Sequence, residues 1–206
     1  MFNEDGSRNA EYLFLLAPLL KGKPVVVGGG ILARRYADEA RKKTGNEFWA
    51  DRAAIRATRE NARITAKACG GKYCETLDEA LAARKRGLQP VMGGMLEGLT
   101  TDSDAVLLAE CLGEKRLVNL SRVSGIYDCN PSKKGARLFK RMTHSQLVAL
   151  ASKFDERKAR TNFPFDLVAC KLAARSKIRI DFVDGRDLAE VRKALQGKPH
   201  LGTVVA

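Results

Sequence analysis

The stretch from residue 25 to residue 34 decides the fold, and it reads Val25-Val26-Val27-Gly28-Gly29-Gly30-Ile31-Leu32-Ala33-Arg34. The valines are typical of a short buried strand at 24–27, and residues 31–43 have the apolar spacing of a helix. The glycines between them carry no side chain, so backbone N–H groups at the helix start can approach an anion, and Arg34 follows one turn later. This pattern predicts phosphate binding. A tight turn whose glycines serve packing stays open as the alternative, because a glycine triplet alone is weakly specific.

Helices and strands alternate outward from this stretch. In the first half we expect helices at 11–20, 31–43, 51–69 and 77–86, with strands at 24–27 and 90–92. In the second half we expect helices at 102–112, 145–150, 167–175 and 188–196, strands at 116–120, 178–183 and 202–205, and a loop at 121–134. Such alternation predicts an α/β fold in three layers (α/β/α), in which helices cover both faces of a mainly parallel central sheet. No convincing linker divides the chain, so we expect a single domain over residues 1–206.

Two further strand ends carry polar groups, and sheets of this kind bind ligands beyond the carboxyl ends of their strands. The strand at 90–92 opens into Gly93-Gly94-Met95-Leu96-Glu97-Gly98-Leu99-Thr100-Thr101-Asp102, where hydroxyls and a carboxylate stand at a helix start. An N-cap by Thr101 or Asp102 accounts for one residue but does not require the glycines, so we favour ligand binding. The strand at 116–120 opens into a polar loop that ends at Pro131 and, taken alone, resembles any surface turn.

Composition argues against several classes of protein. The chain has 206 residues, of which 45% are hydrophobic, so it can bury a core without disulfides or metal. Its longest apolar stretch, 12–20, contains Pro18 and is shorter than the roughly 18 residues of a membrane span. No secretory signal is recognisable, so we expect a cytoplasmic protein without a membrane segment. Five scattered cysteines with no C-x-x-C pair argue against a disulfide framework and a zinc site, so we expect no metal bound by the protein alone.

The formal net charge of +13 comes from 37 lysines and arginines against 24 aspartates and glutamates. Such a charge attracts phosphate groups, either of a small nucleotide or of a nucleic acid. Proteins that bind single strands stack the bases on aromatic side chains. Only 6% of this chain is aromatic, and basic clusters such as Lys133-Lys134 contain no aromatic residue. We therefore favour a small nucleotide and keep nucleic-acid binding as the rival from another class.

Taken in order, these strings resemble the amino-acid-kinase superfamily and, within it, the UMP kinases of archaeal and bacterial type. The family elements G-G-G-x-x-A-R, T-R-x-N-A and G-G-x-x-x-G-x-T-T-D are matched at 28–34, 58–62 and 93–102, and Asp51 precedes the second element. Further matches are the loop at 121–131, the helix that begins at Asp166, and the closing Gly-Thr-x-Val strand at 202–205. The resemblance covers nearly the whole chain. It implies the amino-acid-kinase fold and transfer of the γ-phosphate of ATP to UMP.

The resemblance also implies roles for residues at matching positions. An acceptor-binding part would span about 1–115 and an ATP-binding part about 116–206. Asp51 would bind the ribose of UMP, Arg34 the phosphates of ATP, and Mg²⁺ would bridge those phosphates. The whole UMP site would consist of Gly29, Asp51, Met95, Leu96, Glu97, Gly98, Leu99, Thr100 and Thr101. The whole ATP site would consist of Gly30, Arg34, Ser121, Arg122, Tyr127 and Asn130.

The chain departs from the family pattern at three places. Ser124 and Asn130 stand where family members have Asp, and Met95 stands where they have Thr. The family also opens with a strand and a K-x-G-G-S loop whose lysine contacts the transferring phosphoryl group, and that first strand is missing from the sequence as written. Either Met1 is an internal methionine, or the chain is a short member that binds nucleotide without transferring phosphate. The first explanation is favoured, because loss of a central strand would expose unprotected sheet edges. No catalytic lysine is assigned, and poor phosphate transfer is expected.

Two alternatives to a UMP kinase stay open. One is a sister kinase of the superfamily that acts on a carboxylate, a carbamate or isopentenyl phosphate, although Asp51 and Thr100-Thr101 favour a nucleotide acceptor. The other is a protein that binds nucleotide or nucleic acid without catalysis. For any member of the family, the resemblance implies a homo-oligomer, usually a hexamer, with the 51–69 helix at a dimer contact.

Overall fold

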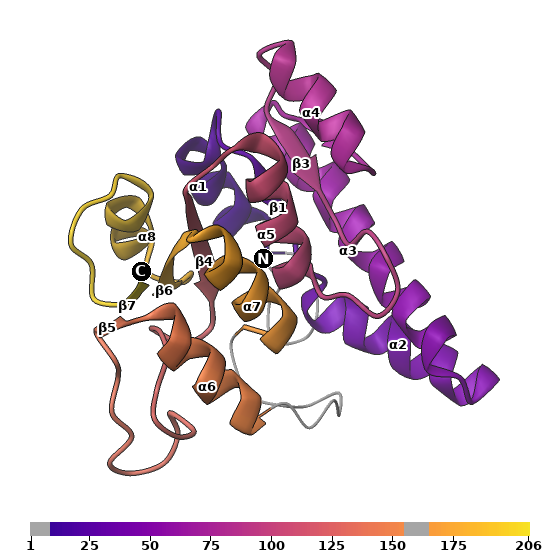
Figure 1. The fold of residues 1–206 in the computed structure, drawn as a ribbon. Coiled ribbons are helices and arrows are strands. Elements are labelled where there is room, and N and C mark those ends of the chain that lie inside the picture. Colours follow the sequence, from indigo (N-terminus) through magenta and orange to yellow (C-terminus); the bar gives the residue numbers. More distant parts are fainter. Residues whose placement is uncertain (1–8, 155–164) are drawn as a thin grey trace. The chain divides into compact units, whose positions relative to one another are not determined.

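The computed structural model describes residues 9–154 and 165–206. The chain divides into two compact units, Met1–Leu112 and Gly113–Ala206, each with its own sheet (Figure 1). The boundary lies close to the division expected near residue 115 between an acceptor-binding and an ATP-binding part. That the two parts make a single domain stays a prediction.

The first unit alternates short parallel strands with helices. Its elements are α1 (Ala10–Leu20), β1 (Val25–Val26), α2 (Gly30–Thr44), α3 (Glu47–Cys69), β2 (Lys72–Cys74), α4 (Leu77–Lys85), β3 (Pro90–Met92) and α5 (Thr101–Leu112). The strands lie in the order β1-β3-β2, with Val25 on one side of Val91 and Tyr73 on the other. All pairs are parallel, so the three carboxyl ends lie at one edge of the sheet.

Helices cover both faces of this first sheet, because successive strand residues point to opposite sides. On one face, Val25 and Val91 pack against small side chains of α1 and α3. On the other face, Val26 and Met92 pack against alanines of α4 and Leu108 of α5. The first unit is therefore a three-layer sandwich, as the alternating pattern predicts.

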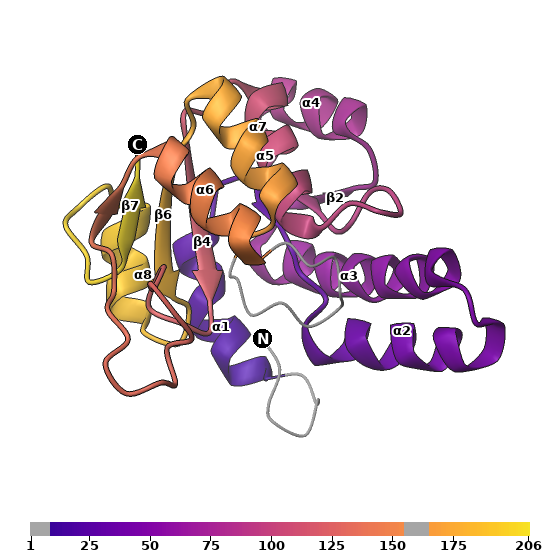
Figure 2. The ribbon, with the colours of Figure 1, turned by 60° about the horizontal axis from the view of Figure 1, so that its bottom comes forward.

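The helices α2 and α3 form a long hairpin, and Figure 2 shows them side by side. The turn between them is short because Gly45 takes the left-handed conformation, with φ of 62°, and donates its N–H to the carbonyl of Arg41. The side chain of Asn46 then accepts a hydrogen bond of 2.8 Å from the N–H of Phe48 and caps α3. As a result, α3 begins one turn ahead of the expected residue 51.

The second unit contains a mixed sheet. Its elements are β4 (Arg116–Ser121), β5 (Arg141–Met142), α6 (His144–Phe154), α7 (Leu167–Ser176), β6 (Arg179–Asp184), α8 (Leu188–Leu195) and β7 (Thr203–Val205). The strand order is β4-β6-β7-β5, and only the β6–β7 pair is antiparallel among these described strands. The expected loop at 121–134 is present but begins one residue later, because Ser121 is the last residue of β4; residues 122–134 contain no helix or extended strand.

Alternating residues of β6 fix the packing of the second unit. Phe182 meets Phe165 edge to face, with 5.4 Å between the ring centres. The neighbouring Asp181 is fully buried and accepts hydrogen bonds from Arg116, Arg179 and His200. Burial by itself would raise the pKa of the Asp181 carboxyl, but these bonds outweigh it and hold the pKa below its usual value. The buried carboxylate therefore ties β6 to β4 and to the segment before β7.

The α/β class with mainly parallel strands and three layers is confirmed. The strands are divided between two sheets, whereas the sequence predicts one central sheet. All expected helices and strands are present with small shifts of their ends, and two strands, β2 and β5, were not expected. Among the described residues, no helix combines the length and the apolar character needed to cross a membrane.

Candidate functional site

Two glycine-rich segments of the first unit lie at the carboxyl edge of its sheet. Gly28–Gly30 follow β1, and residues 93–100 follow β3; we call the latter the β3–α5 loop. Gly28 lies close to the end of this loop, since a Cβ atom built on it would lie 3.6 Å from Oγ1 of Thr101, the first residue of α5. The chain thus brings together the two segments that the sequence predicts to bind ligand.

Some of these glycines serve packing. A Cβ atom on Gly29 would lie 2.1 Å from Cβ of Ala33, and one on Gly93 would lie 2.7 Å from the backbone nitrogen of Arg59. Both positions therefore exclude any larger residue. Gly30 has a φ of 59°, a conformation that favours glycine. The packing alternative, which was stated for residues 28–30, is right for Gly29, and Gly93 serves packing in the same way. Gly28 is exposed and leaves its backbone accessible.

Helix α3 holds both glycine-rich segments through buried polar side chains. Asn61 is 1% exposed, and its Nδ2 donates to the carbonyl oxygens of Gly28 and Gly29 at 3.1 and 3.4 Å. Its Oδ1 has no hydrogen-bond partner among the described residues. One turn earlier, Thr58 accepts a hydrogen bond of 2.6 Å from the N–H of Gly94. A single helix therefore fixes the ends of β1 and β3 relative to each other.

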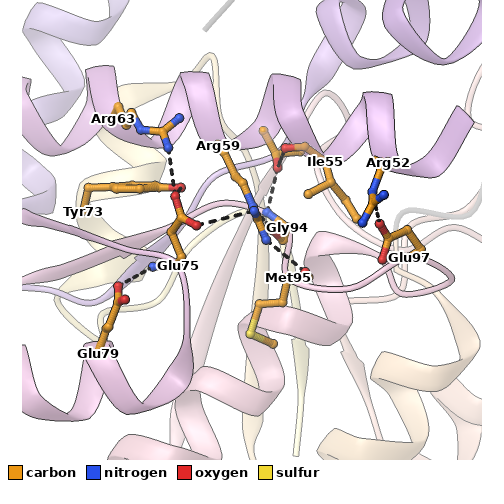
Figure 3. A network of polar contacts seen from close by, with 11 residues as sticks. Arg52, Ile55, Arg59, Arg63, Tyr73, Glu75, Glu79, Gly94, Met95 and Glu97 are labelled. Atoms are coloured by element: carbon orange, nitrogen blue, oxygen red, sulfur yellow. Dashed lines mark hydrogen bonds and ion pairs between the residues drawn. The ribbon is translucent and has the colours of Figure 1, made fainter. Parts of the chain in front are cut away.

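Charged residues of α3 hold the β3–α5 loop further along (Figure 3). Arg59 donates from Nε to the carbonyl of Gly94 at 3.0 Å and from Nη2 to the carbonyl of Met95 at 3.1 Å. Arg52 pairs with Glu97 at 2.9 Å. The pKa of Glu97 is lowered, first by a hydrogen bond from its own backbone N–H and further by Arg52. Helix α3 thus holds the loop both through backbone carbonyls and through the side chain of Glu97.

Asp51, the residue expected to bind a ribose, also contacts the β3–α5 loop from α3. Its Oδ2 accepts the N–H of Gly98 at 3.0 Å, and the side chain is exposed. Leu96, at the tip of the loop, is 58% exposed. Asp51 and the tip of the β3–α5 loop are therefore both exposed to solvent.

The β3–α5 loop ends at Thr100, whose side chain caps the start of α5. The Oγ1 atom of Thr100 accepts from the N–H groups of Asp102 and Ser103, at 3.2 and 3.3 Å. The residue that caps α5 is therefore Thr100, whereas the alternative considered from the sequence placed a cap at Thr101 or Asp102. Asp104 in the first turn accepts the N–H of Met95 at 3.1 Å, which fixes the start of the loop.

Arg34, expected to bind phosphates, lies in the first turns of α2 beyond the glycines. Its side chain is exposed and makes no hydrogen bond or ion pair with any residue of 9–154 or 165–206. The neighbouring Arg35 instead lies over the ring of Tyr36, with 5.9 Å to the ring centre. Within the described part of the chain, Arg34 is thus a cation without a partner, and Gly28 and Gly30 before it are exposed.

In the second unit, the predicted residues lie along the β4 end and the loop that follows. Oγ of Ser121 donates to the carbonyl of Val123 at 2.8 Å. The carbonyl of Arg122 accepts from Arg186 at 2.9 Å, and Arg186 is paired with Asp184 at 2.6 Å. Since Ser121 pairs with Asp184 in the parallel β4–β6 register, both strands end at the same edge.

The loop continues through the other two predicted residues of the second unit. Tyr127 forms an isolated antiparallel bridge with Leu138. The side chain of Asn130 accepts the N–H of Ser132 at 2.9 Å and is exposed. Gly125 packs against β7, where a Cβ atom would lie 2.4 Å from Oγ1 of Thr203. All four residues expected to line the adenine lie on this one segment, from the β4 end to Asn130.

Several residues of the site were not assigned a role from the sequence. Thr58, Arg59 and Asn61 belong to a matched motif, but the motif does not show what they bind. Glu75, which pairs with Arg59 at 3.6 Å and Arg63 at 2.9 Å, follows a strand that was not expected. The sequence feature that could have identified the α3 residues is the presence of polar side chains on the inner face of an amphipathic helix, where Thr58 and Asn61 are buried.

Comparison with known proteins identifies the family. The sequence profile of the amino acid kinase family matches residues 18–184. The chain is 38% identical to the uridylate kinase of Aeropyrum pernix over 84% of this chain and 80% of that one. It is 40% identical to the uridylate kinase of Methanothrix thermoacetophila over 88% and 82%. Both relatives agree with the resemblance seen in the sequence motifs.

Solved structures agree with the sequence relatives. The uridylate kinase of Archaeoglobus fulgidus superposes with a TM-score of 0.83 at 32% identity, covering 97% of this chain and 94% of that one. The UMP kinase of Bacillus anthracis, at 17% identity and a TM-score of 0.79, shares the fold. The chain therefore belongs to the amino acid kinase family, among its uridylate kinases.

Proposed function

We propose that this chain is a phosphotransferase that moves the γ-phosphoryl group of ATP to UMP and forms UDP. The observation that carries the proposal is the β3–α5 loop, held on α3 with Asp51 bonded to Gly98, in a chain whose relatives are uridylate kinases. Formation of UDP would place the reaction in pyrimidine nucleotide synthesis.

The acceptor UMP binds to the first unit in this proposal. Asp51 keeps one carboxylate oxygen on Gly98, and its Oδ1 makes no hydrogen bond with the described residues, so it can accept hydroxyl protons of the ribose. Gly29 and the segment 95–101 supply backbone groups and surface for the rest of the nucleotide. The loop is already held by Arg59, Arg52 and Thr58, so it loses little conformational entropy when UMP binds.

In this proposal the donor ATP contacts the residues that the sequence motifs assign to it. Gly30 and Arg34 contact its phosphates, since a helix start and an unpaired guanidinium both favour anions. Ser121, Arg122, Tyr127 and Asn130 line the adenine. Asn130 stands where an aspartate is typical, so we expect this loop to carry less negative charge near the nucleotide.

Phosphoryl transfer requires positioning and neutralisation of charge more than covalent chemistry. Arg34 is the cation that the first unit offers to the phosphates. Mg²⁺, which neutralises phosphate charge when it is bound, would arrive with ATP. Among the described residues, no three His, Cys, Asp or Glu side chains are grouped to hold a metal ion, so no protein ligand is assigned to it.

The remaining expectations belong to the same proposal. We place the protein in the cytoplasm and expect a homo-oligomer, a hexamer in the usual arrangement of the family, with α3 at a dimer contact. Light scattering coupled to size-exclusion chromatography measures the mass of the assembly directly. A monomer of 22.6 kDa in solution would contradict the expected oligomer.

The experiment that tests the function follows the label of γ-³²P-ATP with Mg²⁺ into products. UMP, CMP, AMP and isopentenyl phosphate are offered separately as acceptors. We expect labelled UDP, formed slowly because no catalytic lysine is assigned, and still weaker transfer to the other three acceptors. Preferential labelling of isopentenyl phosphate would favour a sister kinase, whose solved representative shares the fold at 14% identity. No transfer to any acceptor would contradict the proposed reaction.

A further inference from the structure

We infer that Arg59 is a positioning residue for the acceptor nucleotide: it turns the peptide between Met95 and Leu96 so that the Leu96 N–H faces the ligand. The inference deepens the proposed function and rests on it, since the ligand is taken to be UMP. It assigns a role in acceptor binding to a residue that touches the loop rather than the substrate.

The contact of Arg59 with the loop is bidentate. Its Nε and Nη2 atoms reach two consecutive carbonyl oxygens, those of Gly94 and Met95, at 3.0 and 3.1 Å. The guanidinium is planar and presents its donors in a fixed fork, so it can satisfy two neighbouring carbonyls at once. Lysine would offer a single ammonium group, which cannot reproduce this geometry.

The two carbonyls determine where the following N–H groups point. No peptide bond of the described residues is cis, and in a trans peptide the N–H points away from the carbonyl. With the Gly94 carbonyl on Arg59, the Met95 N–H points to the opposite side and donates to Asp104 at 3.1 Å. The Met95 carbonyl is also on Arg59, so the Leu96 N–H points away from α3 as well.

The Leu96 N–H has no partner among residues 9–112 of the first unit. It makes no hydrogen bond with a described residue, and the Leu96 residue is 58% exposed. A donor held in place at the surface of a ligand-binding loop is available to an acceptor atom of the nucleotide. Arg59 therefore orients the Leu96 N–H for binding without touching the ligand.

Glu75 keeps Arg59 in position from the end of the neighbouring strand β2. Its carboxylate pairs with Nη1 of Arg59 at 3.6 Å and with Arg63 at 2.9 Å, and it accepts the hydroxyl of Tyr73 at 3.1 Å (Figure 3). Arg63 also lies over the ring of Tyr73, with 4.4 Å to its centre. Arg63 thus shares the carboxylate of Glu75 with Arg59 but donates to no loop carbonyl, which makes it a matched control.

The test measures UMP and Mg-ATP affinity by calorimetry for the full chain and for Arg59→Met, Arg59→Lys and Arg63→Met. We expect Arg59→Met to weaken UMP binding about tenfold or more and to leave ATP binding within about twofold, which is the effect of losing charge-assisted hydrogen bonds. Arg59→Lys should recover only part of the loss. Arg63→Met should bind UMP within about twofold of the unsubstituted chain.

Amide hydrogen exchange of the ligand-free proteins provides a readout that does not depend on UMP. The Met95 amide, bonded to Asp104, should exchange faster in Arg59→Met than in Arg63→Met, while amides of the second unit stay unchanged. Equal loss of both nucleotides, full recovery by Arg59→Lys, or equal effects of Arg59→Met and Arg63→Met would overturn the role of Arg59. If the unsubstituted chain does not bind UMP, the proposed function fails, and unchanged exchange at Met95 would separately overturn the positioning role.

Discussion

Gly98 donates its backbone N–H to Oδ2 of Asp51 across 3.0 Å, although 47 positions separate the two residues in the chain. The bond joins the second turn of α3 to the middle of the β3–α5 loop. One oxygen of the carboxylate is thereby fixed, and the other makes no hydrogen bond with a described residue. In the proposed function this geometry holds an acceptor for the ribose of UMP before the nucleotide arrives.

Replacement of Asp51 by Ala is expected to weaken UMP binding about ten- to a hundredfold, because charged hydrogen bonds contribute about 1.5–3 kcal/mol. ATP binding should change much less. Asp51→Asn is the control, since its amide oxygen can still accept the Gly98 N–H without the charge. Calorimetric titration of both variants with each nucleotide measures this. Equal losses for UMP and ATP would show that Asp51 does not belong to a separate acceptor site.

Replacement of Arg34 by Ala is expected to have the opposite selectivity. Arg34 has no ion pair among the described residues, so its loss leaves no unpaired partner in the fold, and stability should not change. ATP affinity should fall about tenfold through the lost phosphate contact, while UMP affinity is affected less. The control is Arg35→Ala, which removes the neighbouring exposed cation. If both variants bind ATP equally well, Arg34 does not contact the donor.

Replacement of Gly93 by Ala should destabilise the protein by about 1–3 kcal/mol, the usual range for overpacking. Its new methyl group would lie 2.7–2.8 Å from backbone atoms of α3, which cannot move independently of the helix. Gly28→Ala is the matched control, because its methyl group has an ordinary contact of 3.6 Å. Urea unfolding compares the two. Similar stability of both variants would contradict the close packing of β3 on α3.

Stability should fall in acid partly through Asp181. Folding lowers the pKa of its buried carboxyl, so the native state binds fewer protons than the unfolded chain. The stabilisation is complete above the unfolded pKa of about 3.9 and is lost as pH falls through the lower folded value. Asp181→Asn should flatten this part of the pH dependence. Parallel curves of unfolding free energy against pH for both proteins would exclude this contribution.

The alternation of elements could be predicted because apolar strands and glycines leave a clear pattern. The valines before Gly28 predict β1, and the motif around Gly93 predicts where β3 ends. In contrast, β2 and β5 are as short as β1 and β3 but begin with the charged residues Lys72 and Arg141, so no run of apolar residues marks them. They form strands because neighbouring strands supply hydrogen-bond partners.

The functional site was predicted unevenly. Motif positions indicated Asp51 and the β3–α5 loop, and the structure joins them. The roles of Arg59 and Asn61 could not be predicted, because each acts on backbone carbonyls 32 to 36 positions away in the chain. Contacts between a side chain and a distant backbone leave no residue-type signature at the backbone position. Only the fold shows which carbonyl is reached.

The most direct test of the acceptor site is an amide chemical-shift map of the 206-residue protein during titration with UMP. We predict that shifts concentrate at Gly28–Gly30, at Asp51 and along residues 93–101, and that subsequent addition of Mg-ATP shifts residues 121–130. A UMP response centred on residues 121–130, or no response in the first unit at saturating UMP, would contradict the account.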